Sequence, residues 1–193
     1  MSKDGEPLPP SYTSMEFPVK DGYGTVLSTH DPVAEIKRLY DDIEEYVEQL
    51  RKNQQPDALE TVVDETTLPR DLRQDILAIY TLSVGVIEAY SVELLLREMV
   101  IEQYQDSTGA RELFEEKMGA SRLVKLLMYF GITDNGLHGE LQNVIDKRND
   151  YVHQHEETLS IRNYDTFLSE VRRCKRGTKQ LAVILDGEDF RDW

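Results

Sequence analysis

The first strong pattern in the chain is a stripe of apolar residues at alternating spacings of three and four over residues 33–50. Acidic residues occupy the other faces, and this combination is typical of an amphipathic helix. Asp31 can cap the first turn, and Pro32 suits a first-turn position. The stripe therefore predicts a helix that starts at Asp31-Pro32, ends near residues 53–56 and packs on a bundle. It is too short to argue for a free coiled coil, which needs three or four heptads.

A second, longer helix is predicted from Leu68-Pro69 to about Gln105. No charged residue occurs over residues 76–87, so this part should be buried nearly all round and form the central helix. Glu88 ends the uncharged run, and Glu93 follows it. A carboxylate beside so much apolar surface must be solvated, paired or protonated. Glu88 either reaches water at the edge of the buried face or has a role in a site.

Shorter apolar patterns predict four more helices, at residues 110–118, 121–130, 137–155 and 161–185. Gly131 is a natural C-terminal stop for the second of these. Thr133 or Asp134 can cap the third. No alternating strand pattern, internal repeat or glycine-rich phosphate loop occurs. The sequence therefore predicts an all-α fold.

Composition adds limits to this picture. With 193 residues the chain fits one domain, predicted at residues 31–193, after a flexible tail at residues 1–30 that is rich in proline and glycine. The net charge of −15 argues against an overall basic nucleic-acid-binding surface, so any RNA contact would have to be local. The single Cys174 cannot form an internal disulfide, and no signal or membrane-spanning segment is evident. We expect a soluble, cytoplasmic protein.

The helix predicted at residues 137–155 carries the candidate chemistry. Its core-facing positions are first apolar: Leu137, Leu141, Val144 and Ile145. The next positions on the same stripe are Arg148, Asn149, Val152 and His153, with His155 one turn further on. Polar groups at packing positions cost free energy unless something satisfies them. This end of the helix is therefore the best site candidate in the chain.

Residues 148–153 read Arg-Asn-Asp-Tyr-Val-His and match the pattern Arg-Asn, three residues, His. The pattern resembles the signature of the HEPN superfamily (higher eukaryotes and prokaryotes nucleotide-binding domains). Members are small helical bundles, and many are metal-independent endoribonucleases. The resemblance covers roughly residues 31–187, with the motif as its one sharp feature. It implies an HEPN-like up-and-down helical bundle with a flexible N-terminal extension.

The residue types suit RNA cleavage by internal attack of a 2′-hydroxyl. His153 can move a proton near neutral pH, because the unperturbed pKa of histidine is roughly 6.5. Arg148 can stabilise charge on the phosphate through its planar fork, and Asn149 can orient either group. The structural alternative is a buried Arg148 paired to Glu88, with His153 as a satisfied core residue. Together with the resemblance, the pattern favours the site.

The resemblance suggests further residues. Many HEPN ribonucleases carry an acidic residue on the helix facing the motif; Glu88 is the closest match in position, and Glu93 is the alternative. His155 fits a looser form of the motif and is the alternative catalytic histidine. In HEPN toxins silenced by a nucleotidyltransferase partner, a tyrosine stands where this chain has His155, so that type of antitoxin partner is less favoured. HEPN ribonucleases commonly work as homodimers, and we expect the same here.

Two functions follow as hypotheses. The first is a metal-independent endoribonuclease of a defence, stress or toxin-type system, with RNA as its substrate and no cofactor. The second is a non-catalytic HEPN-like module that binds nucleotide, RNA or a partner protein. No metal site is predicted, because Cys174 stands alone and neither CxxC nor HExxH occurs. The densest basic cluster comprises Arg172, Arg173, Lys175, Arg176 and Lys179, either as a solvated face or, through the first four, as an RNA-binding edge.

Overall fold

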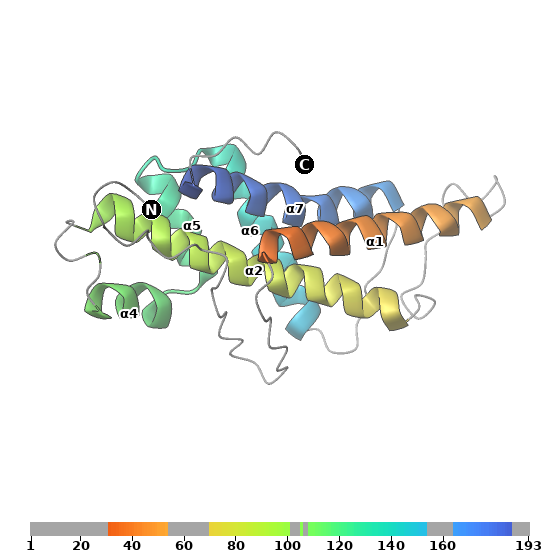
Figure 1. Ribbon diagram of the computed structural model, residues 1–193, viewed down its shortest axis with the longest axis horizontal. Coiled ribbons are helices and arrows are strands. Elements are labelled where there is room, and N and C mark those ends of the chain that lie inside the picture. Colours follow the sequence, from red (N-terminus) through yellow and green to blue (C-terminus); the bar gives the residue numbers. More distant parts are fainter. Residues whose placement is uncertain (1–30, 54–69, 101–104, 106–107, 154–163, 187–193) are drawn as a thin grey trace, which may run out of the picture.

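The structure is a computed structural model that describes residues 31–53, 70–100, 105, 108–153 and 164–186 (Figure 1). These residues form six helices: α1 (Pro32–Asn53), α2 (Arg70–Met99), α4 (Thr108–Lys117), α5 (Ala120–Tyr129), α6 (Asn135–His153) and α7 (Tyr164–Asp186). No strand occurs among them, so the all-α prediction is confirmed. The predicted N-terminal tail, and the turn after α6, lie outside the described residues.

Helix α2 is the centre of the bundle, as predicted, and packs against every other helix of the described part (Figure 1). Its length and composition alone would allow it to cross a membrane, but 67% of its most apolar window is buried inside the protein. Burial of this extent is expected for the core helix of a bundle. Leu77 and Ala78 are exceptions within the uncharged run, because both are exposed.

The end of α2 differs from the prediction. The helix ends at Met99 and does not run to about Gln105. The side chain of Gln105 instead turns back, and its Nε2 donates hydrogen bonds to the carbonyl oxygens of Arg97 and Val100, each at 3.1 Å. The last carbonyls of a helix have no partner within it, so this side chain satisfies one of them, that of Arg97, together with the carbonyl of Val100 just beyond the helix. A residue predicted to extend the helix therefore caps it.

Three other helix ends agree with the sequence. At the start of α1, the Asp31 side chain accepts a hydrogen bond from the backbone N–H of Val33 at 2.9 Å. Gly131 follows α5 with a positive φ of 71°, a conformation that glycine adopts without strain. At the start of α6, Asp134 Oδ1 accepts from the backbone N–H of Leu137 at 2.7 Å. Asp134 is therefore the cap of α6.

Helix α6 is held between α2, α5 and α7. On the α7 side the contact is close at Gly177, where an added Cβ would lie 3.0 Å from Cδ2 of the fully buried Leu141. A glycine here lets the two helices approach. The packing fixes the axis of α6 and hence the direction in which the motif residues project.

Candidate functional site

The apolar part of the predicted stripe on α6 lies in the core. Its four members are all buried: Leu137, Leu141, Val144 and Ile145. Beyond Ile145 the stripe becomes polar and half-buried, with Arg148 and Asn149 both at intermediate exposure. The change from a buried to a half-buried face therefore coincides with the start of the motif.

Arg148 and Asn149 are brought together. Nη1 of Arg148 donates a hydrogen bond to Oδ1 of Asn149 at 3.3 Å. The Nε of Arg148 is buried, so the root of the guanidinium lies against protein and the group does not extend freely into solvent. His153 is the last residue of α6, but its side chain lies outside the described part, as does all of His155. The choice between the two histidines stays a prediction.

Tyr151 packs the last turn of α6, which carries the motif, against the central helix α2. Its ring meets that of Tyr80, on α2, edge-on, with the ring centroids 5.0 Å apart. Tyr80 is completely buried. Burial raises the pKa of both hydroxyls, so both rings stay neutral at physiological pH. This pair could not be predicted from the sequence, because the motif alone does not indicate which residue of another helix Tyr151 contacts.

Glu88, the predicted acidic member of the site, is exposed and holds a different element. Its Oε1 accepts a hydrogen bond from the backbone N–H of Ala120 at 3.1 Å, in the first turn of α5. Gly119 occupies the N-cap position of α5 and offers no side-chain acceptor, so Glu88 supplies one from α2. An ion pair between Glu88 and Arg148, the structural alternative, is not found in the part of the chain that the structure describes.

The register of the helices separates Glu88 from the motif end. The Tyr80–Tyr151 contact sets one level of the antiparallel pair α2 and α6. Glu88 lies eight residues further along α2, which is about 12 Å of helix rise. It lies opposite the middle of α6, where Gln142 Nε2 donates to Ser121 Oγ at 3.1 Å, next to Ala120.

The alternative acidic residue, Glu93, is engaged as well. Its Oε1 lies 2.6 Å from Nη1 of Arg111, on α4. The pKa of the Arg111 guanidinium is raised, and the largest cause is its hydrogen bond to Glu93. Glu93 therefore fastens α4 to α2. Both predicted acidic residues bind neighbouring helices, and a role for either in chemistry stays a prediction.

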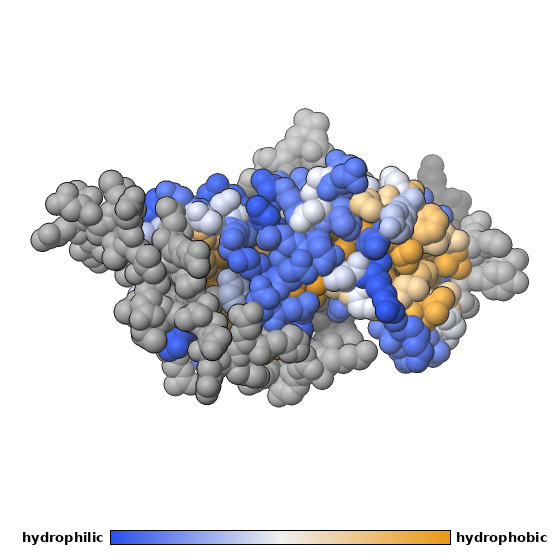
Figure 2. Space-filling model, turned by 180° about the vertical axis from the view of Figure 1, so that it is seen from behind, coloured by the Kyte–Doolittle hydropathy of each residue, from blue (hydrophilic) through white to orange (hydrophobic). Residues whose placement is uncertain are grey.

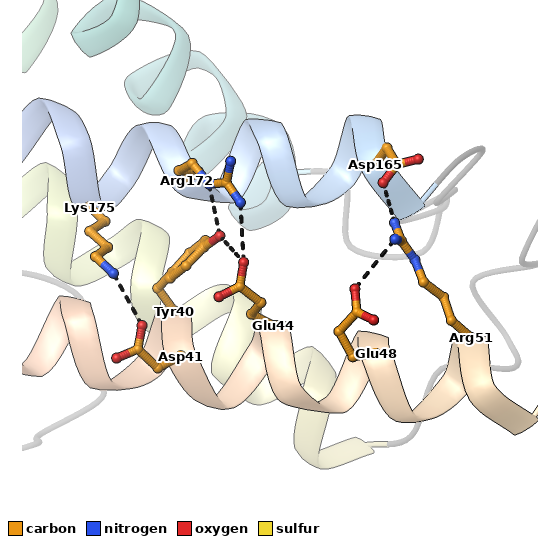
Figure 3. Close-up of polar contacts among 8 residues, drawn as sticks. All are labelled: Tyr40, Asp41, Glu44, Glu48, Arg51, Asp165, Arg172 and Lys175. Atoms are coloured by element: carbon orange, nitrogen blue, oxygen red, sulfur yellow. Dashed lines mark hydrogen bonds and ion pairs between the residues drawn. The ribbon is translucent and has the colours of Figure 1, made fainter.

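Two members of the basic cluster on α7, Arg172 and Lys175, face carboxylates of α1 (Figure 3). Arg172 donates from Nε to the Tyr40 hydroxyl at 2.9 Å and from Nη2 to Glu44 at 3.1 Å. Lys175 donates to Asp41 at 3.1 Å, and its ammonium lies 4.7 Å from the ring centre of Tyr40. These contacts join α7 to α1, and they supply each cation with a nearby negative charge.

A third member of the cluster binds α6. Nε of Arg176 donates to Oε2 of Glu140 at 2.7 Å. Arg173 has no ion pair with any described residue and is half-buried. Three of the four predicted RNA-binding cations therefore have carboxylate partners within the bundle. This arrangement favours the solvated, charge-balanced face over an RNA-binding edge.

Other chemistry finds little support in the part of the chain that the structure describes. No group of His, Cys, Asp and Glu side chains there is close enough to hold a metal ion. Cys174 is fully buried, and burial raises the pKa of its thiol to about 12, so its nucleophilic thiolate form is disfavoured.

Comparison with known proteins adds no family to this description. No protein-family model, no curated protein and no solved structure matches the chain.

Proposed function

We propose that the chain is a metal-independent endoribonuclease of the HEPN type, from a defence, stress or toxin-type system. The observation that carries the proposal is Arg148, held by Asn149 at a half-buried position where the α6 stripe would otherwise continue as core. A guanidinium with its root against protein and a side-chain amide at its tip is preorganised for a phosphate. The spelling of residues 148–153 adds the histidine that such chemistry needs.

In the proposed reaction the 2′-oxygen of a ribose attacks the adjacent phosphorus, and the bond from phosphorus to the 5′-oxygen breaks. His153 takes the 2′-hydroxyl proton or supplies one to the departing 5′-oxygen. Arg148 stabilises the negative charge that gathers on the phosphate oxygens. The products are a 2′,3′-cyclic phosphate and a 5′-hydroxyl. His155 is the alternative proton carrier.

One Arg148 and one His153 supply only one proton-transfer group, whereas the reaction needs both an acid and a base. We therefore propose a two-fold homodimer that brings two copies of the motif together. The interface would include the motif helix α6 and part of α2 near Glu88, in an isologous contact. Light scattering on the purified protein should give twice the 22.3 kDa chain mass. A monomer that cleaves RNA at full rate would contradict the composite site.

The decisive experiment is incubation of the purified chain with mixed RNA in EDTA. Cleavage should persist, leave 2′,3′-cyclic phosphate ends, and be lost in Arg148→Ala and in His153→Ala. Arg73→Ala is the matched control, because it removes the same charge from an exposed position on α2. Products with 3′-hydroxyl ends, or loss of activity on chelation, would contradict the mechanism. RNA binding without cleavage would favour the non-catalytic HEPN-like module.

A further inference from the structure

Helix α5 differs in charge from the rest of the protein. The chain has a net charge of −15, yet residues 120–129 contain no Asp or Glu. Arg122, Lys125 and Tyr129 are spaced by three and four residues and therefore lie along one side of the helix. All three are exposed, whereas the opposite side is buried in the core by Leu123, Val124 and Leu127. We call Arg122, Lys125, Tyr129 and the adjoining Phe130 the α5 stripe.

The cations of the α5 stripe are not neutralised in the way those of α7 are. Neither Arg122 nor Lys125 forms an ion pair with a carboxylate of the described residues. The Lys125 ammonium lies instead over the Tyr129 ring, 5.6 Å from its centre. Carboxylates nearby are engaged elsewhere: Glu88 binds the backbone of Ala120, and Asp146 accepts a hydrogen bond from Gln142.

The aromatic members are the most exposed large apolar side chains of the described part. Tyr129 is 66% exposed and Phe130 54%. Figure 2 shows apolar side chains gathered on the surface at the end of the molecule where α4 and α5 lie. Exposed rings that gather in one place mark a contact surface more often than isolated ones do.

We propose that the α5 stripe is a contact surface for single-stranded RNA. Cations without carboxylate partners can follow the phosphates, and the rings can stack on unpaired bases. The inference rests on the proposed function in one respect: it assigns the strand that α5 holds to the substrate of the α6 site. It differs from the sequence prediction, which placed RNA on α7.

The stripe starts close to the α6 face that carries Asn149. Ser121, next to Arg122, is bonded to Gln142 of α6. Asn149 is seven residues beyond Gln142 and so lies on the same side of α6, about 10 Å along its axis. Helix α5 is about 15 Å long. A strand that leaves the motif along α5 would meet the two cations first and the two rings after them.

A protein partner is the competing occupant, since Leu113 and Met99 are also exposed on α4 and at the end of α2. The combination of cations and exposed rings on α5 favours RNA. Arg122 and Lys125 are two positive charges with no negative charge on their helix, beside rings accessible for stacking. A purely apolar docking helix would leave the two cations without a negative partner, whereas an RNA strand brings a phosphate to each.

The test is fluorescence anisotropy with a 5′-labelled oligouridine of about a dozen nucleotides, in EDTA, in the full-length Arg148→Ala background so that cleavage cannot intervene. Arg122→Ala/Lys125→Ala should weaken binding and reduce the slope of log affinity against log salt by about 1.4, two phosphate contacts' worth on a single strand. Tyr129→Ala should weaken binding about 5- to 150-fold at fixed salt and leave the slope unchanged. Lys52→Ala/Arg73→Ala is the control with the same charge change at exposed positions.

Unchanged affinity in the α5 variants, or equal loss in the control, overturns the inference. If Tyr129→Ala alters the mass in light scattering but not RNA affinity, the surface binds protein instead, which also overturns it. The experiments can refute one proposal without the other. If RNA binding depends on the α5 stripe but the wild-type chain never cleaves RNA, the RNA surface is supported and the ribonuclease is refuted. If the wild-type chain cleaves RNA and the α5 variants cleave it equally well, the ribonuclease is supported and the RNA surface is refuted.

Discussion

Replacing Glu88 separates a structural role from a catalytic one. Its carboxylate accepts the backbone N–H of Ala120 at the first turn of α5, where Gly119 provides no side-chain acceptor. Loss of such a cap costs about 1 kcal/mol, within a range of about 0.5–2. The negative charge beside the positive end of the helix dipole contributes a further few tenths at an exposed position. Glu88→Ala should therefore lower the free energy of unfolding by about 1 kcal/mol.

Glu88→Gln should cost less, about 0.5 kcal/mol, because the amide oxygen can still accept from Ala120 while the charge is lost. For a chain of this size, a loss of 1 kcal/mol lowers the melting temperature by about 2–4 °C. Urea denaturation monitored by circular dichroism measures the free energy, and a thermal scan checks it. RNA cleavage by both variants should remain at the wild-type rate once folding is complete.

A second substitution makes the test sharper. Gly119 has extended backbone angles, and nothing lies within 4 Å of the position where a Cβ would be. Gly119→Ser should therefore fit and supply a local cap for α5. In the Glu88→Ala background it should restore a few tenths of a kcal/mol, which is the difference between serine and glycine at an N-cap. If Glu88→Ala leaves stability unchanged but abolishes cleavage, or if Gly119→Ser does not rescue, the capping account is wrong and Glu88 belongs to the site.

Three further predictions concern the candidate site and the core. Arg148→Leu should keep the free energy of unfolding within about 1 kcal/mol of wild type, or raise it, while RNA cleavage is lost; unfolding would make Arg148 a structural residue. Burial raises the pKa of the Cys174 thiol to about 12 and that of the Tyr80 hydroxyl as well. Because the folded-state values exceed the unfolded ones, stability should be complete below about pH 9. It should then fall by up to about 1.4 kcal/mol per pH unit, from about pH 9 to 12 for the Cys174 thiol and above about pH 10 for the Tyr80 hydroxyl. Cys174→Ala should reduce that slope in urea titrations, and an unchanged slope would contradict the assignment. Gly177→Val should cost about 1–3 kcal/mol through its clash with Leu141, and Leu141→Ala should cost less in that background than alone, as a double-mutant cycle in urea would show; additive losses would contradict the close contact.

Helix positions were predictable where the signal is local. The caps at Asp31 and Asp134 and the stop at Gly131 are written in neighbouring residues, and all three are confirmed. The end of α2 was not predictable in this way. Gln105 is a good helix former, yet α2 ends at Met99 and the Gln105 side chain bonds to the carbonyls of Arg97 and Val100. That is a tertiary event with no periodic signature.

The candidate site was predictable to the same extent. The break of the α6 stripe at Arg148 is visible in the spacing, and the structure finds Arg148 and Asn149 half-buried and bonded there. The partners across helices are not visible. Glu88 looks like a stray carboxylate in an apolar run until the start of α5, with its glycine cap, comes to lie beside it. Tyr151 acquires a role only through its contact with Tyr80.

The sequence also does not show which basic residues remain unpaired once the helices pack. The densest run of cations, on α7, is the obvious candidate for an RNA surface in an acidic chain. Yet α7 packs between α1 and α6, whose acidic faces provide a partner for Arg172, Lys175 and Arg176. Helix α5 has only Arg122 and Lys125, but no carboxylate of the described residues pairs with them. The cations that can bind a phosphate are therefore those that packing leaves without a carboxylate partner. In the described part of this bundle, α5 has fewer cations than α7 but more of this unpaired positive charge.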